Sequence, residues 1–330
     1  MAPVGALVPA TGRYAVQGAQ VRAGLELWAS RTGTRLVVED DCSRPERAAR
    51  LHAKLVERGC HFVLGPYGSD STRAVAAARP SAVVWNHGAA ADDVQRLPNV
   101  VSVPSPASRY LLALGRAVAA LRPTATIALV TANGHFARFA REGLERADPA
   151  LGLGILACFS FRDAPAAIAG AGADAILACG PVGAEVALFR ALARLVPSTL
   201  RGGVSPGLAA FPALLGGDPE GLLAPVQWHP ETRTSPELGP SSAALVADAR
   251  ASAFGELDYV AAQVYAAALI AGRCLELDPD DPLGAARRFR TTTFFGGFEL
   301  DPATGLQRGH RLSVVRWGRG RQELLHAEAG

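Results

Sequence analysis

Apolar and polar positions alternate in a regular order along the first third of the chain. The short run Val4–Val8 is apolar, and apolar residues then recur at helical spacing between Gln17 and Trp28. This alternation of strand and helix repeats, which predicts a parallel β-sheet covered by helices on both faces. The next strands are expected at Arg35–Glu39, His61–Leu64, Ala82–Trp85 and Val100–Val103, with helices at Pro45–Arg58, Ser71–Ala78 and Ser108–Leu121.

A second alternating set begins after Pro123, and a Pro-, Ser- and Thr-rich stretch from Trp228 to Pro240 reads as a linker. Two sets in one chain predict an α/β protein with two doubly wound parallel-sheet lobes. The second set comprises strands at Ile127–Val130, Leu153–Phe159, Ala175–Ala178 and Leu222–Val226, and helices at Phe136–Arg146, Ala164–Ala169 and Gly183–Leu195. Beyond the linker, helices are expected at Ser242–Phe254 and Tyr259–Leu275, and strands or hairpins at Phe294–Leu300, Arg311–Val315 and Glu323–His326.

One strand–turn–helix junction carries binding chemistry. Val63 and Leu64 run into Gly65-Pro66, and the hydroxyl residues Ser69, Ser71 and Thr72 then open a helical pattern. A helix start leaves backbone N–H groups unpaired and carries partial positive charge, so this turn can hold a carboxylate or another anion at the carboxyl edge of a parallel sheet. The competing interpretation is that such a hydroxyl only caps its own helix.

Other strand-end turns are expected near this junction. The turn at residues 85–90 follows the fourth strand, and residues 9–14 follow the first, so parallel pairing would place both beside the junction. In the second lobe, residues 133–136 also follow a strand and open a helix, where Phe136 could close over a bound molecule. Phe136 and Tyr67 have an equal alternative as core residues.

Composition excludes several classes of partner. The 330 residues are 49% hydrophobic and 19% charged, with a net charge of +3 and scattered arginines, so neither nucleic acid nor an anionic membrane is expected to bind. The longest weakly polar run, Tyr259 to Gly272, is too short to span a bilayer, so no direct membrane insertion is expected. The five cysteines are odd in number and irregularly spaced, which argues against disulfides and a zinc site.

Catalytic and cofactor motifs match by letter only. Gly203–Gly207 fits a nucleophile elbow, but no strong apolar strand precedes it, and Pro206 lacks the N–H that an oxyanion hole needs. Gly152–Gly154 opens a strand instead of following one, so no dinucleotide cofactor is expected. His87 and His135 have no partners at metal-ligand spacing. We therefore expect no catalytic residue, metal or cofactor, and no enzyme.

Six segments carry a family resemblance: Pro9–Gly12 with Gln17–Gly18, Glu39–Ser43 with Pro45, Gly65–Ser69, Ala173–Ile176, Asp258–Ala267, and Gly296–Asp301 with Gly305. In this order and spacing they resemble the type I periplasmic-binding-protein fold. Within that fold they are similar to the branched-chain amino acid and amide solute-binding receptors of ABC transporters, the leucine-binding-protein-like family.

The resemblance implies a hinged clamp with discontinuous lobes. Three crossovers would join a first lobe of residues 1–117 and 229–297 to a second lobe of residues 118–228 and 298–330. The implied activity is capture of a small polar molecule, such as an amino acid, an amide or a related carboxylate, in the cleft between the lobes. Hinge closure and delivery to an ABC permease would follow.

The same resemblance implies a set of ligand contacts. The Ser69 hydroxyl would hold a carboxylate, and backbone groups around Gly88 and Ala89 would add to it. Phe136 falls where the family places a stacking aromatic. The expected ligand-binding residues are Gln17, Tyr67, Gly68, Ser69, His87, Gly88, Ala89, Ala90, Phe136, Arg162 and Trp228.

The sequence departs from the family pattern at several of these positions. Ala90 stands where a hydroxyl residue is frequent, and His87 where a small residue or proline is frequent. Arg162 occupies the neighbourhood, residues 160–163, in which the family's acidic partner of an amino group would lie. Arginine favours a carboxylate or another acceptor over an ammonium group. A plain branched-chain amino acid is therefore in doubt, and a polar or acidic derivative, an amide or an aromatic acid fits equally.

The N-terminus leaves the cellular location open. Met1-Ala2-Pro3-Val4 runs directly into the first strand, without a basic segment and apolar core. The chain is expected to be cytoplasmic if Met1 is the native start, and periplasmic or extracellular, with a lipid anchor, if an export segment has been removed. The missing signal favours an alternative function, a cytoplasmic ligand sensor that regulates a protein partner. The missing effector domain and the late family segments favour the transport receptor.

Overall fold

The computed structural model describes residues 2–252 and 255–327 and divides the chain into two compact units. Unit 1 comprises Met1–Pro106 and Pro230–Arg311, and unit 2 comprises Ala107–His229 and Leu312–Gly330. The chain therefore passes from one unit to the other three times, the number of crossovers implied by the resemblance. The boundaries differ from the predicted ones at residue 117 and at residue 297.

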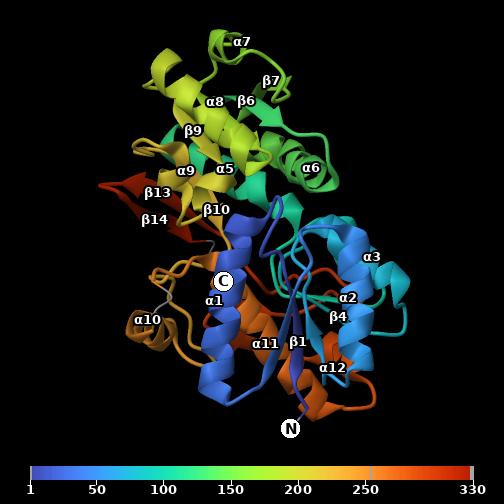
Figure 1. The fold of residues 1–330 in the computed structure, drawn as a ribbon. Helices are drawn as coiled ribbons and strands as arrows, with labels where there is room; N and C mark the ends of the chain where they lie inside the picture. The colour runs from blue at the N-terminus through green and yellow to red at the C-terminus, as the bar shows by residue number, and fades with distance from the viewer. Residues whose placement is uncertain (1, 253–254, 328–330) are drawn as a thin grey trace. The chain divides into compact units, whose positions relative to one another are not determined.

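The five strands of the unit 1 sheet are all parallel, in the order β2-β1-β3-β4-β5. Helix α1 lies beside α11 on one face, and α2 lies beside α3 on the other (Figure 1). The strands are β1 Val4–Val8, β2 Leu36–Asp40, β3 Val63–Leu64, β4 Val84–Asn86 and β5 Val100–Ser102. The helices of the first segment are α1 Ala15–Thr32, α2 Pro45–Glu57, α3 Ser69–Ala78 and α4 Asp92–Gln95.

The later segment of unit 1 adds helices and a short hairpin. Its helices are α10 Ser242–Ala251, α11 Tyr259–Leu277 and α12 Pro282–Arg288, and its hairpin pairs β11 Thr291–Thr293 with β12 Gly296–Phe298. The segment predicted as strands or hairpins, Phe294–Leu300, thus begins at the hairpin turn, and β12 lies within it. The helix predicted at Ser242–Phe254 ends at Ala251, and its predicted end, Phe254, lies outside the described residues.

Helix α11 is apolar around most of its circumference. Among the described residues it is the one helix that could cross a membrane by length and composition, yet 67% of its most apolar window is buried inside the fold. Its side chains meet α1, α12 and the strands β3 and β4. An all-round apolar helix is what a core position requires, so α11 is the central helix of unit 1.

The unit 2 sheet is mixed, with the order β14-β13-β10-β9-β8-β6-β7. Strands β6 to β10 are parallel, and the terminal hairpin adds β13 and β14 antiparallel at one edge. The strands are β6 Thr126–Thr131, β7 Gly154–Phe159, β8 Ala175–Cys179, β9 Leu200–Gly203, β10 Leu223–Val226, β13 Ser313–Gly318 and β14 Arg321–Ala327. The helices are η1 Ala107–Arg109, α5 Tyr110–Leu121, α6 His135–Leu151, α7 Pro165–Gly170, α8 Val182–Leu195, η2 Ser205–Gly207 and α9 Phe211–Leu215.

Tertiary packing explains where the predicted boundaries moved. Helix α5 packs against α6 and β10, so it belongs wholly to unit 2 although its pattern continues directly from the first strand set. Conversely, the residues after β12 stay in unit 1 because Gln307 donates from Nε2 to the carbonyl of Val103, at 3.1 Å. The Oγ of Ser105 also lies 2.9 Å from Nδ1 of His310. These buried polar contacts involve residues some 200 positions apart, which no local pattern can predict.

Two strands were missed by the sequence prediction, β11 at Thr291–Thr293 and β9. The segment Leu200–Gly203, here β9, contains an arginine and two glycines and therefore lacks the apolar run used as the strand signal. It pairs in parallel with β8, so that Ala175 lies opposite Leu200 and Ala178 lies opposite Gly203. Its position between β8 and β10 buries both glycines, so the sheet itself supplies the burial that the local sequence does not indicate.

Gly143 in α6 is required by the close approach of this helix to η1. A Cβ atom at Gly143 would lie 1.8 Å from the carbonyl oxygen of Ser108, which is backbone and cannot turn away. We expect Gly143→Ala to destabilise the protein by about 1–3 kcal/mol through overpacking. The shift in the urea unfolding midpoint of unit 2, followed by circular dichroism, measures it.

The matched control is Gly183→Ala in the first turn of α8. A Cβ atom at Gly183 would meet nothing within 4 Å. This substitution should leave stability unchanged or raise it by up to about 1 kcal/mol, because alanine is the better helix former. Equal midpoints for the parent protein and Gly143→Ala would contradict the packing described.

Candidate functional site

The carboxyl edge of the unit 1 sheet brings the predicted turns together. Tyr67 and Gly88 form a parallel bridge beyond the ends of β3 and β4, and the Gly68 N–H donates to the Gly88 carbonyl at 3.2 Å. The turn after β1 joins them, because the Tyr14 and Tyr67 rings meet edge to face with centroids 5.3 Å apart. The expected adjacency of these three turns is confirmed.

Ser69 lies in the first turn of α3 but does not cap it. The N-cap residue is Gly68, whose φ of 95° suits glycine, and it provides no side-chain cap. The half-buried Ser69 hydroxyl instead accepts a hydrogen bond from the Ala91 N–H at 3.3 Å. Its own hydrogen therefore remains available to donate, alongside the N–H groups of the first helical turn, which have no carbonyl within the helix.

The other two hydroxyl residues of this turn serve the interior. Ser71 is 3% exposed and Thr72 is fully buried. The Thr72 hydroxyl donates to the Pro66 carbonyl at 3.3 Å and so fastens the turn to its helix. Of the three hydroxyl groups singled out by the sequence, only that of Ser69 stays partly open to solvent.

Asn86, which sequence reasoning missed, organises the turn after β4. Its Oδ1 accepts from the N–H groups of Gly88 and Ala89, at 3.1 and 2.7 Å, and its Nδ2 donates to Ser102 Oγ at 2.8 Å. Those two N–H groups are therefore used within the turn. Ala89 is completely buried and Ala90 is 7% exposed. An asparagine at the end of a strand, two residues before a glycine, was the available signal for such a turn.

His87 lies beneath the turns and is completely buried. Neither ring nitrogen has a hydrogen-bond partner in the described part of the chain. Its Nε2 would lie 3.0 Å from a Cβ atom built on Gly65, which places the ring under the β3 turn. Burial lowers the pKa of His87 to about 3, so the ring is neutral and apolar in effect.

An aromatic wall borders this edge. The Tyr67 ring lies so close to Gly88 that a Cβ atom there would come within 2.3 Å of it. The guanidinium group of Arg13 lies 4.5 Å above the Tyr14 ring and donates to the Tyr14 hydroxyl. Burial is the main cause of the raised pKa of Tyr14. Gln17, in the first turn of α1, is 6% exposed, and its Oε1 is buried without a partner among the described residues.

The predicted residues of unit 2 follow the carboxyl ends of its own strands. Phe136 is half-buried in the first turn of α6 and meets Tyr110 edge to face at 5.0 Å. Trp228 follows β10 and is 3% exposed, and its neighbour Gln227 donates from Nε2 to the Tyr110 hydroxyl at 2.6 Å. Arg162 is exposed in the turn after β7, where its N–H donates to Ser160 Oγ.

Glu185 holds two further turns of the same edge and was not predicted. Its Oε1 accepts from the Gly180 N–H after β8, and its Oε2 accepts from the Ser205 N–H after β9, both at 2.8 Å. The carboxyl group is completely buried, which raises its pKa to about 8 against the opposing effect of these hydrogen bonds. Glu185 therefore positions turns and has no exposed surface for a ligand.

Ser205 does not have the setting of a nucleophile elbow. The strand that precedes it, β9, is short and is not strongly apolar, a 3₁₀ turn follows in place of a helix, and Ser205 is 3% exposed. The buried pair Ser105–His310 has the contact of a nucleophile and base, yet both are fully buried and the Ser105 hydroxyl also bonds the His310 carbonyl. Within residues 2–252 and 255–327, no cluster of histidine, cysteine and carboxylate side chains suits a metal.

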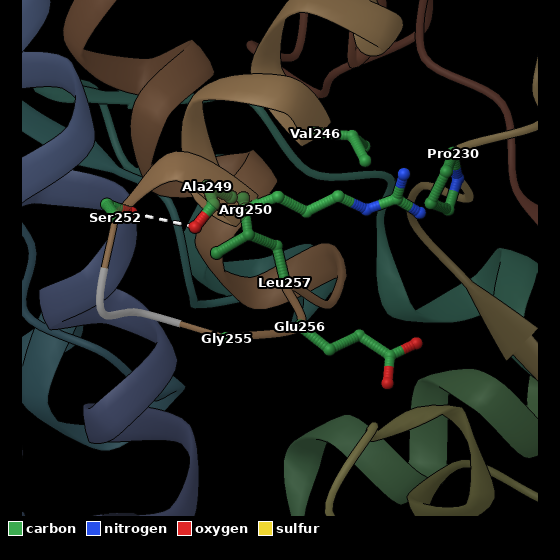
Figure 2. A pocket seen from close by; sticks show the side chains of 8 residues that line it. All are labelled: Pro230, Val246, Ala249, Arg250, Ser252, Gly255, Glu256 and Leu257. Carbon is green, nitrogen blue, oxygen red and sulfur yellow. Dashed lines mark hydrogen bonds between the residues drawn. The ribbon is translucent and has the colours of Figure 1, made fainter.

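A pocket of about 460 Å³ in unit 1 lies away from these turns. Figure 2 shows Arg250 and Glu256 extending from its wall, with Ser252 bonded to the Ala249 carbonyl. Leu257 and Val246 contribute apolar lining. None of the predicted ligand residues lines this pocket. Residues 253–254, which border it in sequence, lie outside the described part, so we assign it no role.

Comparison with known proteins gives one consistent result. The sequence model of the family described as periplasmic binding protein matches residues 2–321. No curated protein matches the chain. Among solved structures, similar folds include a solute-binding protein of an ABC transporter from R. palustris in complex with 4-hydroxybenzoate. That match has a TM-score of 0.81 and 17% identity, covering 97% of this chain and 94% of the other.

Two amino acid receptors have the same fold. A branched-chain amino acid transporter substrate-binding protein from Streptococcus pneumoniae, in complex with isoleucine, matches with a TM-score of 0.82 and 17% identity over 99% of both chains. A leucine-binding protein from Thermotoga maritima matches with a TM-score of 0.84 and 16% identity, over 99% of this chain and 98% of the other. At these identities the likeness shows a common fold.

The buried His87 makes stability depend on pH. Its pKa is about 3 in the folded chain and near 6.5 when unfolded, so the unfolded chain binds a proton first and folding is weakened as pH falls through 6.5. We expect the parent protein to lose about 2 kcal/mol between pH 7 and pH 5 from this residue. Urea unfolding at both pH values measures the loss.

Substitution isolates this contribution from that of other titrating groups. Between pH 7 and pH 5, His87→Leu should lose about 2 kcal/mol less of its unfolding free energy than the parent protein loses. His61→Leu, at an exposed position, should behave like the parent. An unchanged pH dependence in His87→Leu would show that His87 is not held neutral.

Proposed function

Because the chain belongs to the periplasmic binding protein family, we propose that it is a solute-binding receptor for a small carboxylate-bearing molecule. The receptor role follows from the family, whose model covers nearly the whole chain. The ligand class is our proposal and rests on the turn at the start of α3. Amino acids, their amides and related acids all fall within that class.

The observation that supports it best is the donor set around Ser69. Its hydroxyl oxygen is used by Ala91, which leaves the hydrogen to donate, and the first-turn N–H groups lie beside it. All of these groups are donors, and they stand where the helix dipole favours negative charge. A carboxylate provides two acceptor oxygens and suits this arrangement better than a neutral or cationic group.

The surroundings of Ser69 favour a flat or apolar body attached to that carboxylate. Tyr14 and Tyr67 form an edge-to-face pair next to the turn, and Arg13 adds a cation above Tyr14. Aromatic side chains bind flat apolar groups without requiring further hydrogen bonds. The structurally similar receptors were solved with 4-hydroxybenzoate, benzoate and isoleucine, and acids of both kinds fit the proposal.

We propose that binding works by hinge closure without chemical change of the ligand. The three chain crossings between the units are the only covalent links that closure has to bend. The ligand would bind first to unit 1. In the closed form it would also contact Phe136, Arg162 and Trp228 of unit 2, and these added contacts would favour closure. Delivery to an ABC permease outside the cytoplasm is the role that family membership supports.

A ligand screen tests the receptor proposal directly. Protein stripped of co-purified ligand is heated with amino acids, their amides, and aromatic and dicarboxylic acids, and the unfolding midpoint is recorded. Ligand at about 100 times its dissociation constant adds roughly 2.7 kcal/mol, which raises the midpoint by several degrees. Acids that raise it support the proposal, whereas silence across every acid in the panel contradicts the carboxylate class.

Substitution of Ser69 and Phe136 tests the contacts. Ser69→Ala should weaken binding of the best ligand about ten- to a hundredfold, because one hydrogen bond to a charged group is worth about 1.5–3 kcal/mol. Phe136→Ala should also weaken binding, while the fold stays intact by circular dichroism. The control is Ser81→Ala at an exposed position outside these turns. If isothermal titration finds parental affinity in both test variants, these residues do not contact the ligand.

A further inference from the structure

A second pocket, of about 310 Å³, lies within unit 2 at the junction of β6 and α6. It is distinct from the donor set around Ser69, which belongs to unit 1. The charged or titratable side chains that line it are His135, Arg138 and Arg141, and Thr131 and Asn133 add neutral polar groups. Its described lining contains no carboxylate, because the glutamates that pair with its arginines, Glu142 and Glu145, lie outside the lining.

The two arginines are only weakly neutralised by their own helix. The Nε of Arg138 is 3.7 Å from Glu142, and that of Arg141 is 3.3 Å from Glu145, in exposed i,i+4 pairs. Such pairs contribute little in water because solvent screens them. The Nε of Arg141 is buried and, although Glu145 lies 3.3 Å away, it forms no hydrogen bond in the described chain. A buried donor of this kind is costly unless an acceptor reaches it.

The neighbouring turn carries charges of both signs. Strand β7 pairs with β6 as far as Phe159, which lies opposite Val130. The turn after β7 therefore lies next to the turn after β6, which lines the pocket. Arg162 is exposed in that turn. Asp163 is engaged by the N–H and hydroxyl of Ser160, at 2.7 and 3.0 Å, and these hydrogen bonds lower its pKa. Asp163 therefore stays negatively charged and offsets Arg162, so the positive charge of the pocket comes from Arg138 and Arg141.

We propose that this pocket binds an anionic group, a carboxylate, phosphate or sulfate, through Arg138 and Arg141. Guanidinium groups bind such oxyanions in charge-assisted and often bidentate hydrogen bonds. Asn133 and Thr131 supply neutral hydrogen bonds that can orient the anion. Two sources share this chemistry. One is a second acidic group on the receptor's own ligand, which rests on the proposed function, and the other is a free inorganic anion.

Titration with inorganic anions tests the pocket without knowledge of the ligand. Sulfate and phosphate are titrated into the ligand-free protein by calorimetry, with chloride at equal ionic strength as the reference. Arg141→Gln and Arg138→Gln should each weaken binding of these anions by about tenfold or more. The matched control is Arg146→Gln, which lies on the same helix, is 64% exposed and pairs with Glu142 but does not line the pocket.

The outcomes separate the pocket from general electrostatics and from the first proposal. Loss in Arg138→Gln and Arg141→Gln with parental binding in Arg146→Gln supports the pocket. Equal affinity in the parent and the three arginine variants overturns it. An equal loss of affinity in all three variants also overturns it, because binding then depends only on the net charge of the protein. Loss of sulfate binding in Ser69→Ala, with parental binding in Arg138→Gln and Arg141→Gln, would place the anion at the turn of unit 1 and overturn the pocket, so the two proposals fail separately.

A comparison of monocarboxylic and dicarboxylic acids of equal length identifies the source. If Arg141→Gln weakens dicarboxylic acids and leaves monocarboxylic acids unchanged, the pocket receives the second acidic group of the ligand. If it weakens sulfate and phosphate alone, the pocket holds a free anion. Both results support an anion site, and parental binding of every anion tested in Arg141→Gln and Arg138→Gln refutes it.

Discussion

The pairing of β3 with β4 continues past the ends of the strands, and the proposed ligand-binding edge of unit 1 depends on it. The bridge between Tyr67 and Gly88 holds the start of α3 against the turn after β4. The Ala91 N–H can then reach Ser69, and the Tyr67 ring can lie on Gly88, where a side chain would collide with it. A shift of one residue in this register would turn Ser69 away and fill the space that the ring occupies.

The two units show different ways of fixing turns at a sheet edge. In unit 1 a neutral amide, Asn86, satisfies the backbone of its turn, and a buried neutral histidine fills the space beneath. In unit 2 a buried carboxylate, Glu185, joins two turns through backbone N–H groups. Buried polar groups of this kind are tolerated because hydrogen bonds satisfy them. His87 has no such partner in the described chain, and it avoids the cost of a buried charge by staying unprotonated.

The binding chemistry also differs between the units. The edge of unit 1 presents hydroxyl and backbone donors beside two tyrosines, which suits one carboxylate with a flat or apolar body. The pocket of unit 2 presents arginines, which suits an anion with several acceptor oxygens. Arg162 lies in the neighbourhood, residues 160–163, where the family resemblance implied an acidic residue, and is exposed in the turn after β7. Together these features favour acidic ligands over zwitterionic ones in the proposed receptor.

Periodicity in the sequence was sufficient for most strands and helices and for the two-lobed α/β class, because short apolar runs and helical stripes record which side of each element is buried. Family segments added the three crossings. The sequence could not supply β9, whose glycines are buried only by the neighbouring strands, or the unit boundaries, which depend on α5 and on contacts such as Gln307 with Val103. It located Ser69 correctly at a helix start. Tertiary structure alone decided that Ser71 and Thr72 face inward, that Asn86 uses the N–H groups of its turn, and that His87 is buried, because each depends on what the adjacent strand places beside it.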